Sequence, residues 1–256
     1  MQNMGVGEAA MQISIIIPAL NEAASLPRVL SRIPRLPEIT EVVLVNGASS
    51  DGTPDVAKQV LPEIRIVDQD GQGKGNAVRC GARVVTGDYF LVLDADGSHL
   101  PEEIPLYVEM AKQGFDMVKG CRYVAGGGTD DETLDRGILV RLADFVANLL
   151  WGTDFRDMAY GMYLIDRRKF LELHIQADHF DIEWEVLIKA RRKGLKIARV
   201  PAYEAPRMHG KSHLTYRRDG VLIFTTVMRE AFRGFKDRII GGRAGVHPEE
   251  RRGESG

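Results

Sequence analysis

Short runs of β-branched and other apolar residues alternate, in the first half of the chain, with stretches of helical periodicity. Each run has the length of a strand and is apolar on both faces. The predicted strands are 13–17, 42–46, 64–67, 89–93 and 116–120, and the helix-compatible stretches between them are 22–33, 53–60, 74–85 and 101–113. Strands of this kind, separated by helices, are typical of a parallel sheet covered on both sides. The pattern therefore predicts an α/β fold.

The pattern changes after residue 123. Residues 124–133 contain three consecutive glycines and no periodicity, which indicates a mobile surface loop. Beyond it the predicted elements are a long helix at 134–151, a polar connecting stretch, a helix at 181–193, a strand at 196–200 and an amphipathic helix at 219–237. We expect a flexible leader at 1–11, one domain at 12–218, the amphipathic helix as a separate unit at 219–238, and a disordered tail at 239–256.

Composition excludes several classes of protein. The 256 residues are 44% hydrophobic and 27% charged, which excludes a wholly disordered chain. A formal net charge of −2 gives no reason to expect a nucleic-acid partner. Two cysteines are too few for a disulfide scaffold and fit a reducing compartment. Because neither a signal peptide nor a run of about 18 apolar residues is found, we expect a cytoplasmic protein whose membrane contact, if any, is peripheral.

Charge is unevenly distributed along the chain. Residues 94–135 carry ten acids and three bases, whereas residues 189–218 carry ten bases and one acid. A basic run is often only a solvated face. Here, however, the bases surround a glycine-bearing loop, which also fits a site for an anion. Both interpretations stay open at this point.

Asp94 and Asp96 come directly after the apolar run at 89–93. Alternation along an extended chain points both carboxylates the same way, and strand ends are where open α/β sheets bind ligands. Two carboxylates without histidine or cysteine partners suit a hard cation, Mg²⁺ or Mn²⁺, that also holds phosphate oxygens. The alternative is a simple turn, because Asp96-Gly97-Ser98 is also good turn chemistry.

Two glycine patterns match only part of the motifs of other nucleotide-binding proteins. Gly71, Gly73 and Gly75 lack the further glycine of a dinucleotide fingerprint, since Asn76 stands there. The segment 210–212 has the ending of a P-loop, but the required earlier glycine is absent and no strand-loop-helix surrounds it. Dehydrogenase and P-loop ATPase are therefore excluded.

Further polar segments follow strand ends or open helices, in a fixed order along the chain. They are Pro18-Ala19-Leu20-Asn21-Glu22, the run from Asn46 to Thr53, Gly73-Lys74-Gly75-Asn76-Ala77, Gly120-Cys121-Arg122-Tyr123, Asp157 with Gly161, the helix of Glu185, and Arg207-Met208-His209-Gly210-Lys211-Ser212. With these segments the chain resembles, from about residue 12 to 215, the family 2 inverting glycosyltransferases of the GT-A fold. Within them it resembles the dolichol-phosphate mannose synthase group, which transfers a sugar from a nucleotide donor to a polyprenyl phosphate.

The resemblance implies a Rossmann-like, mostly parallel sheet with helices on both faces, and a donor site at its edge. The implied nucleotide-sugar residues are Pro18, Ala19, Asn21, Glu22, Asn46, Asp51, Lys74, Asp94, Ala95 and Asp96. Asp94 and Asp96 would hold the metal, with Ser98 where many mannosyl enzymes have glutamine. The family usually has an acid in place of Asn46, which leaves guanine against uracil open.

The resemblance also implies an acceptor site. The catalytic residues that it implies are Asp94, Asp96, Arg122 and Arg207. The implied acceptor-binding residues are Arg122, Asp157, Glu185, Arg207, Lys211 and Ser212. Guanidinium groups bind phosphate in bidentate fashion, which agrees with an anionic acceptor. The family often has Pro-Thr-Ser where this chain has Met158-Ala159-Tyr160.

The mechanism depends on the acceptor, and two acceptors stay open. A polyprenyl phosphate is already anionic and needs only alignment, whereas a saccharide or small-molecule hydroxyl needs a general base. The candidate bases are Asp157, Asp181, Glu183 and Glu185. A binding protein without catalysis and a nucleotidyltransferase are weaker hypotheses, because both aspartates are intact and no glycine-rich loop follows the first strand. The sugar and the oligomeric state stay open.

Overall fold

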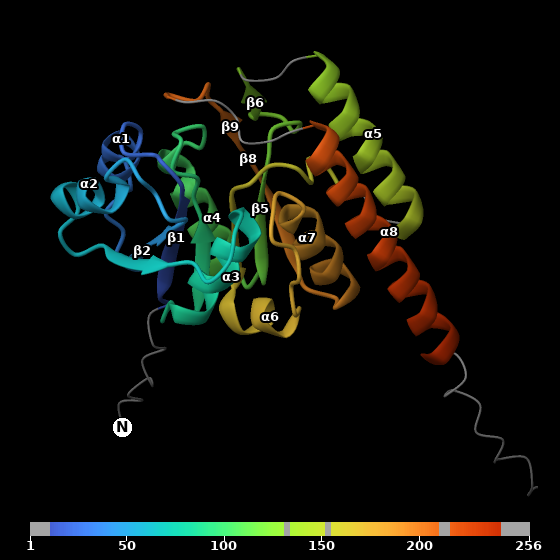
Figure 1. Cartoon of the computed structure of the whole chain (residues 1–256). Helices are drawn as coiled ribbons and strands as arrows, with labels where there is room; N and C mark the ends of the chain where they lie inside the picture. The colour runs from blue at the N-terminus through green and yellow to red at the C-terminus, as the bar shows by residue number, and fades with distance from the viewer. Residues whose placement is uncertain (1–10, 131–133, 152–154, 210–215, 242–256) are drawn as a thin grey trace, which may run out of the picture.

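The computed structural model describes residues 11–130, 134–151, 155–209 and 216–241. A sheet of seven strands in the order β3-β2-β1-β4-β7-β5-β8 forms its centre (Figure 1). Strand β7 is antiparallel to both neighbours and all other adjacent pairs are parallel. These strands are β1 (Ile13–Ala19), β2 (Ile39–Asn46), β3 (Arg65–Asp68), β4 (Tyr89–Val92), β5 (Met117–Cys121), β7 (Tyr163–Asp166) and β8 (Ile197–Pro201). The predicted α/β class and mostly parallel sheet are confirmed.

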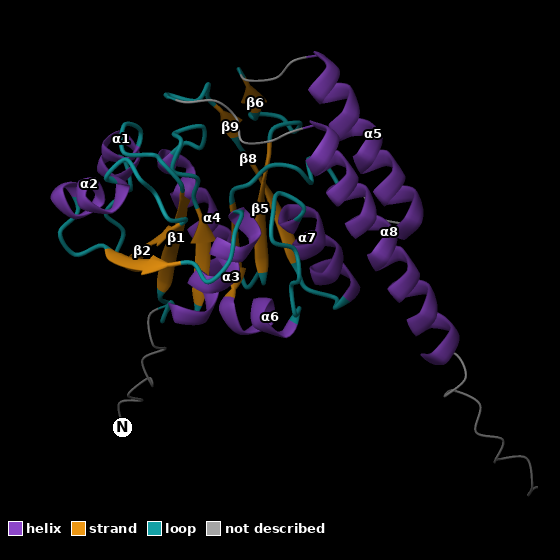
Figure 2. Ribbon diagram, in the orientation of Figure 1, coloured by secondary structure: helices purple, strands orange, loops and turns teal. Residues whose placement is uncertain are grey.

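Helices cover both faces of the sheet (Figure 2). Alternate residues of β1 face opposite sides, so Ile16 joins one apolar core while Ile15 and Ile17 join the other. Helices α1 (Leu26–Ser31), α2 (Thr53–Val60) and α4 (Ile104–Lys112, after a 3₁₀ turn at Pro101–Glu103) contribute to the core of Ile15, and α3 (Lys74–Val84), α6 (Arg167–Glu172) and α7 (Ile182–Arg192) contribute to the core of Ile16. Because both faces of the sheet are buried, the sequences of its strands are continuous apolar runs.

The largest difference from the predicted elements lies between residues 155 and 181. The sequence pattern predicts a polar connecting stretch there, but the chain forms β7 and then α6 without a break. Leu164 and Ile165 are fully buried between β4 and β5, and the side chain of Asp166 caps α6 by accepting a hydrogen bond from the Lys169 amide at 2.9 Å. A strand of four residues that runs directly into a helix is too short to show either periodicity.

Two smaller boundaries also differ. Helix α1 begins at Leu26 rather than at 22, because Asn21 has a φ of +57° and the chain makes a turn before the helix. Within the predicted loop at 124–133, the two residues of β6 (Gly128–Thr129) pair with β9 (Tyr203–Glu204). Pairing across this distance in the chain cannot be predicted from local pattern.

Two long helices lie side by side along one flank of the molecule, α5 (Leu134–Trp151) and α8 (Tyr216–Gly241) (Figure 1). Helix α8 includes the predicted amphipathic segment and continues past it to Gly241, so the first residues of the predicted tail are helical. The rest of the tail, 242–256, and residues 1–10 of the predicted leader lie outside the described residues. In the described part of the chain, no helix combines the length and apolar character needed to cross a bilayer.

Candidate active site

A pocket of about 510 Å³ opens where β1, β2 and β4 end and α3 begins. Parallel strands bring their carboxyl ends to one edge, so the loops that follow them meet there. We call this the strand-end pocket; its lining residues are Pro18, Ala19, Leu20, Glu22, Gly47, Ala48, Gln69, Gly71, Gln72, Gly73, Lys74, Ala77, Asp94, Ala95, Asp96, His179, Phe180 and Arg207. The two aspartates that were expected to face one site do so.

Each aspartate of this pair has a cationic partner. The Lys74 Nζ lies 2.7 Å from a carboxylate oxygen of Asp94 and 2.9 Å from one of Glu183. Arg207 Nη1 lies 2.9 Å from Asp96 Oδ2. Residues from three distant parts of the chain therefore converge on the two carboxylates.

The ionisation of these groups follows from burial and charge. Burial by itself raises the pKa of Asp94, but the neighbouring Lys74 outweighs it and lowers that pKa to about 2. Burial lowers the pKa of Lys74, yet Asp94 and Glu183 more than offset it and raise the pKa above its usual value. Burial and then the charge of Asp96 raise the pKa of Glu22 to about 7. The pocket thus contains the fixed charges of Asp94 and Lys74, and a carboxyl group, Glu22, whose ionisation is opposed by burial and by the charge of Asp96.

These side chains fit a divalent cation. Three carboxyl groups, Glu22, Asp94 and Asp96, line the pocket together with two cations, Lys74 and Arg207, and the negative charge of Asp96 already opposes the ionisation of Glu22. Carboxylate oxygens are the ligands that Mg²⁺ and Mn²⁺ prefer. The described residues contain no group of three acidic, histidine or cysteine side chains arranged as a complete metal site. An ion held by the two aspartates would therefore take further oxygen ligands from a substrate or water.

The Asp96 segment also forms the turn that was the alternative interpretation of Asp96-Gly97-Ser98. Asp96 Oδ1 accepts hydrogen bonds from the Ser98 amide at 2.9 Å and the Ser98 hydroxyl at 2.7 Å. Gly97 has a φ of +80°, and the side chain of Met208 leaves no room there for a Cβ. Ser98 is buried and does not line the pocket, so its place in a metal shell stays a prediction.

The model of the family described as glycosyl transferase family 2 matches residues 14–180. The chain belongs to this family.

Curated relatives agree with this assignment. Glycosyltransferase AglJ of Haloferax volcanii is 31% identical over 224 residues, which cover 86% of this chain and 72% of the relative. A dolichol-phosphate mannosyltransferase of Pyrococcus furiosus is 30% identical over 242 residues, covering 90% and 67%. An undecaprenyl-phosphate mannosyltransferase of Micrococcus luteus is 28% identical over 215 residues, covering 80% and 88%.

Solved structures show the same fold. Glucosyl-3-phosphoglycerate synthase from Mycobacterium tuberculosis, in complex with Mn²⁺, uridine diphosphate and glucosyl-3-phosphoglycerate, superposes with a TM-score of 0.68 at 22% identity. The match covers 86% of this chain and 80% of that structure. The GT-A architecture implied by the resemblance is therefore confirmed.

Seven of the ten implied donor residues of this glycosyltransferase line the strand-end pocket. The other three, Asn21, Asn46 and Asp51, do not line it and instead form hydrogen bonds within the loops that follow β1 and β2. Asn21 Oδ1 accepts from the Ser50 amide at 2.8 Å, and Asp51 accepts from the Ala23 amide at 3.0 Å. The amide of Asn46 donates to Asp68 at 2.8 Å and accepts from the Ser49 amide at 3.0 Å. Direct donor contacts by these three stay predictions.

The implied acceptor residues do not all line the strand-end pocket. Arg207 lines the strand-end pocket, whereas Arg122, Asp157 and Glu185 are buried and do not. Arg122 donates from its amide and Nε to Asp157 Oδ2, both at 2.8 Å, and its Nη1 pairs with Glu204. Lys211 and Ser212 lie outside the described residues. Acceptor contacts by Arg122, Asp157 and Glu185 stay predictions.

The four candidate general bases each have a partner inside the protein. Asp157 pairs with Arg122, Asp181 accepts from Thr226 at 2.7 Å, and Glu183 pairs with Lys74. The fourth, Glu185, accepts hydrogen bonds from two backbone amides. None of the four lines the strand-end pocket.

Several lining residues escaped the sequence analysis. Gln69, Gly71, Gln72 and Gly73 form one wall, and of these only Gly73 belongs to a segment that carries the family resemblance. Gly73 has a φ of +90° and lies so close to the Asp178 carbonyl that a Cβ does not fit. His179 and Phe180 form another wall and come from the connection between α6 and α7, for which no sequence signal existed.

Proposed function

We propose that this glycosyltransferase is an inverting, metal-dependent enzyme that moves a sugar from a nucleotide-diphosphate donor, GDP-mannose or a UDP-hexose, to a polyprenyl phosphate. The observation that carries the proposal is the strand-end pocket, in which Asp94 and Asp96 lie together with Glu22 and with the cations Lys74 and Arg207. The polyprenyl-phosphate mannosyltransferases among the relatives support the acceptor.

The residues of the pocket have different roles in the proposed reaction. Mg²⁺ or Mn²⁺, when bound at Asp94 and Asp96, would supply the positive charge that stabilises the leaving diphosphate. Lys74 fixes Asp94 in its ionised form and in one orientation. Arg207 reaches the same edge from the basic stretch of the chain and would orient an anionic acceptor. A phosphate nucleophile needs no general base, which agrees with the internal partners of the four candidate bases.

An assay that pairs each acceptor with its phosphate-free analogue tests this proposal. Purified protein with Mn²⁺ and either GDP-mannose or UDP-glucose is offered a short polyprenyl phosphate, the corresponding polyprenol or a free sugar. We expect transfer to the phosphate alone. Transfer to the polyprenol or to a free sugar would instead show a hydroxyl acceptor, and donor hydrolysis without transfer would contradict both.

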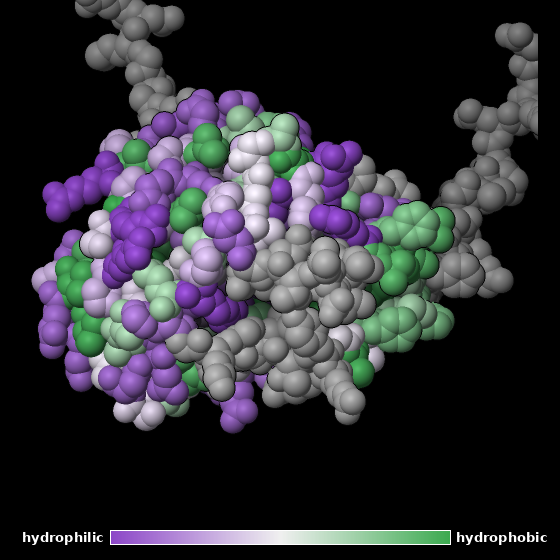
Figure 3. Space-filling view, turned by 90° about the horizontal axis from the view of Figure 1, so that it is seen from above, coloured by the Kyte–Doolittle hydropathy of each residue, from purple (hydrophilic) through white to green (hydrophobic). Residues whose placement is uncertain are grey.

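We further propose that the flank formed by α5 and α8 lies on the cytoplasmic surface of the membrane that holds the acceptor. Large apolar side chains are exposed there, with Phe145 at 64%, Leu149 at 75%, Phe224 at 64% and Phe232 at 69%. Figure 3 shows apolar residues gathered on this flank. The buried side of α8 is different, since Ile223 and Val227 pack on the core. One helix thus has a packed side and an exposed apolar side.

Charge complementarity favours a bilayer as the surface that covers this flank. Arg141 is exposed on α5 one turn before Phe145, as basic residues are on interfacial helices that bind anionic lipid, whereas Arg229 and Arg233 of α8 pair with the buried Glu185 and Glu230. Sedimentation with anionic vesicles tests this contact on the double variant Phe145→Glu/Phe224→Glu. We expect about tenfold weaker binding, while Leu106→Glu, an exposed leucine on α4, binds as the wild type does. Equal binding by all three proteins would mean that the flank does not contact the membrane.

A further inference from the structure

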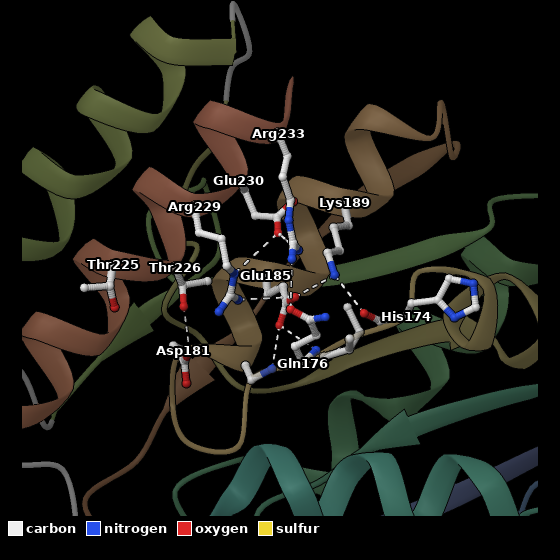
Figure 4. A network of polar contacts seen from close by, with 12 residues as sticks. His174, Gln176, Asp181, Glu185, Lys189, Thr225, Thr226, Arg229, Glu230 and Arg233 are labelled. Carbon is white, nitrogen blue, oxygen red and sulfur yellow. Dashed lines mark hydrogen bonds and ion pairs between the residues drawn. The ribbon is translucent and has the colours of Figure 1, made fainter. Parts of the chain in front are cut away.

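Glu185 is a fully buried carboxylate whose two oxygens face different elements (Figure 4). Oε2 accepts hydrogen bonds from the backbone amides of Gln176 at 2.9 Å and Ala177 at 2.6 Å. Oε1 lies 2.6 Å from Lys189 Nζ and 3.3 Å from Arg229 Nη2 of α8. The side chain therefore joins α7, α8 and the chain segment at 174–180, which we call the 174–180 loop.

The 174–180 loop presses against the start of α3. The Asn76 amide donates to the Asp178 carbonyl at 3.1 Å, and Arg79 pairs with the Asp178 side chain. Gly73 and Gly75 face the carbonyls of this loop with no room for a Cβ. Because α3 begins at Lys74, the position of the loop sets the position of the lysine that holds Asp94.

The same loop is also a wall of the strand-end pocket. His179 and Phe180 line the pocket, and the Phe180 ring centroid lies 6.0 Å from Lys74 Nζ. Glu185 itself does not line it. Any effect of Glu185 on a ligand there must therefore pass through the loop.

Besides its contact with Glu185, helix α8 forms hydrogen bonds with Gln176 in the 174–180 loop and with Asp181 just after it. Arg233 Nη2 donates to Gln176 Oε1 at 3.1 Å, and the Thr226 hydroxyl donates to Asp181 Oδ2 at 2.7 Å (Figure 4). Asp181 Oδ1 in turn accepts from the His179 amide at 3.3 Å. The helix that carries the exposed apolar flank is thus bonded to the wall of the pocket.

We propose that Glu185 is a positioning residue for nucleotide binding, which fixes the 174–180 loop against α3 and links that wall to α8. The inference rests on the proposed function, because it takes the strand-end pocket as the nucleotide site. It differs from the acceptor contact implied by the resemblance. A carboxylate that accepts hydrogen bonds from two backbone amides holds them more firmly than a neutral oxygen does. Leaving a buried amide without a hydrogen bond is costly, so the position of the loop depends on this carboxylate.

The substitution Glu185→Gln removes the charge and keeps the shape. Calorimetry with GDP and with UDP, each with Mn²⁺, should show about tenfold weaker binding of the nucleotide that the wild type prefers. The KM for polyprenyl phosphate should stay within about twofold of the wild-type value. Hydrogen exchange of the Gln176 and Ala177 amides should be faster.

Glu41→Gln is the matched control. Glu41 also accepts from a backbone amide, that of Thr86 at 3.0 Å, and pairs with an arginine, Arg65 at 3.3 Å. It lies near the opposite end of β2 from the strand-end pocket, so nucleotide binding should be unchanged. A loss in both variants would show a general loss of stability and would overturn the proposal.

A second variant separates α8 from the loop without touching Glu185. Thr226→Val/Arg233→Leu removes the hydrogen bonds from α8 to Gln176 and to Asp181. We expect roughly threefold weaker nucleotide binding. This variant also carries the test if Glu185→Gln does not fold. Wild-type affinity in the double variant would exclude α8 from the positioning.

The remaining outcomes distinguish this proposal from the proposed function. If Glu185→Gln raises the acceptor KM while nucleotide binding is unchanged, the residue acts on the acceptor and the proposal is wrong. If the wild type binds neither nucleotide, the proposed function fails and the nucleotide part of the inference fails with it. Amide exchange of Gln176 and Ala177 then still decides whether Glu185 holds the loop.

Discussion

Two arginines of this glycosyltransferase, Arg207 and Arg122, each pair with an aspartate in contrasting surroundings. Arg207 lines the strand-end pocket, and its side chain is 22% exposed and reaches Asp96 at 2.9 Å. Its Nε has no hydrogen-bond partner among the described residues. Arg122 is 2% exposed, and its Nε, Nη1 and Nη2 all bond Asp157 or Glu204.

The difference concerns which donors are left for a ligand. A partly exposed arginine that lines a pocket can bind a phosphate at the cost of its ion pair. An arginine whose donors are all used by buried carboxylates stabilises the fold, because removing it leaves those charges unpaired. We therefore expect loss of Arg122 to affect stability first and loss of Arg207 to affect turnover first.

Arg122→Leu should have the largest effect. Asp157 is fully buried, so removing its partner should lower the free energy of unfolding by about 3–5 kcal/mol. Urea unfolding measures this, with Arg207→Leu as the control that should lose less than about 1 kcal/mol. A stable Arg122→Leu protein that fails only to use the acceptor would reverse the comparison.

Asp96→Asn tests the carboxylate that Arg207 faces. We expect turnover to fall by at least about 10²-fold with the fold intact, because the charge of a bound metal dominates this kind of chemistry. Circular dichroism and steady-state rates measure the two quantities, and Asp55→Asn, an exposed aspartate on α2, should behave as the wild type. Full activity in excess chelator would exclude the metal.

Arg207→Ala should have a smaller effect on turnover than Asp96→Asn. A loss of about 2 kcal/mol, roughly 30-fold, is expected in acceptor use, since its ion pair is only partly buried. The acceptor KM and the nucleotide dissociation constant are measured side by side. If nucleotide affinity falls by the same factor, Arg207 serves the donor.

Asp144→Asn should have the smallest effect and extends the buried side of the comparison. Asp144 on α5 accepts from the Asp157 amide at 2.7 Å and the Met158 amide at 3.2 Å. An asparagine keeps one acceptor oxygen, so we expect a loss of about 1–2 kcal/mol in unfolding free energy without a change in acceptor KM. A raised acceptor KM would show that the buried cluster of Arg122 also positions the acceptor.

The sequence by itself determined the parallel strands of the sheet, the residues at their ends and the family. Runs such as Ile13–Ile17 are apolar on both faces, which only a sheet covered by helices accommodates. Asp94 and Asp96 follow one strand directly, and Pro18 and Ala19 end another. Because parallel strands end at one edge, local order along the chain was enough to bring these residues together.

Only the tertiary structure decided which charged groups are paired with partners inside the protein and which face the pocket. The partners of Arg122 are 35 and 82 positions away in the chain, and the amides held by Glu185 belong to a loop that no pattern marks. Strand β7, too, is defined by its antiparallel neighbours rather than by its four residues. Local sequence sets the direction of a side chain, but its partner depends on how distant segments pack, and the partner decides whether a charge remains free to bind a ligand.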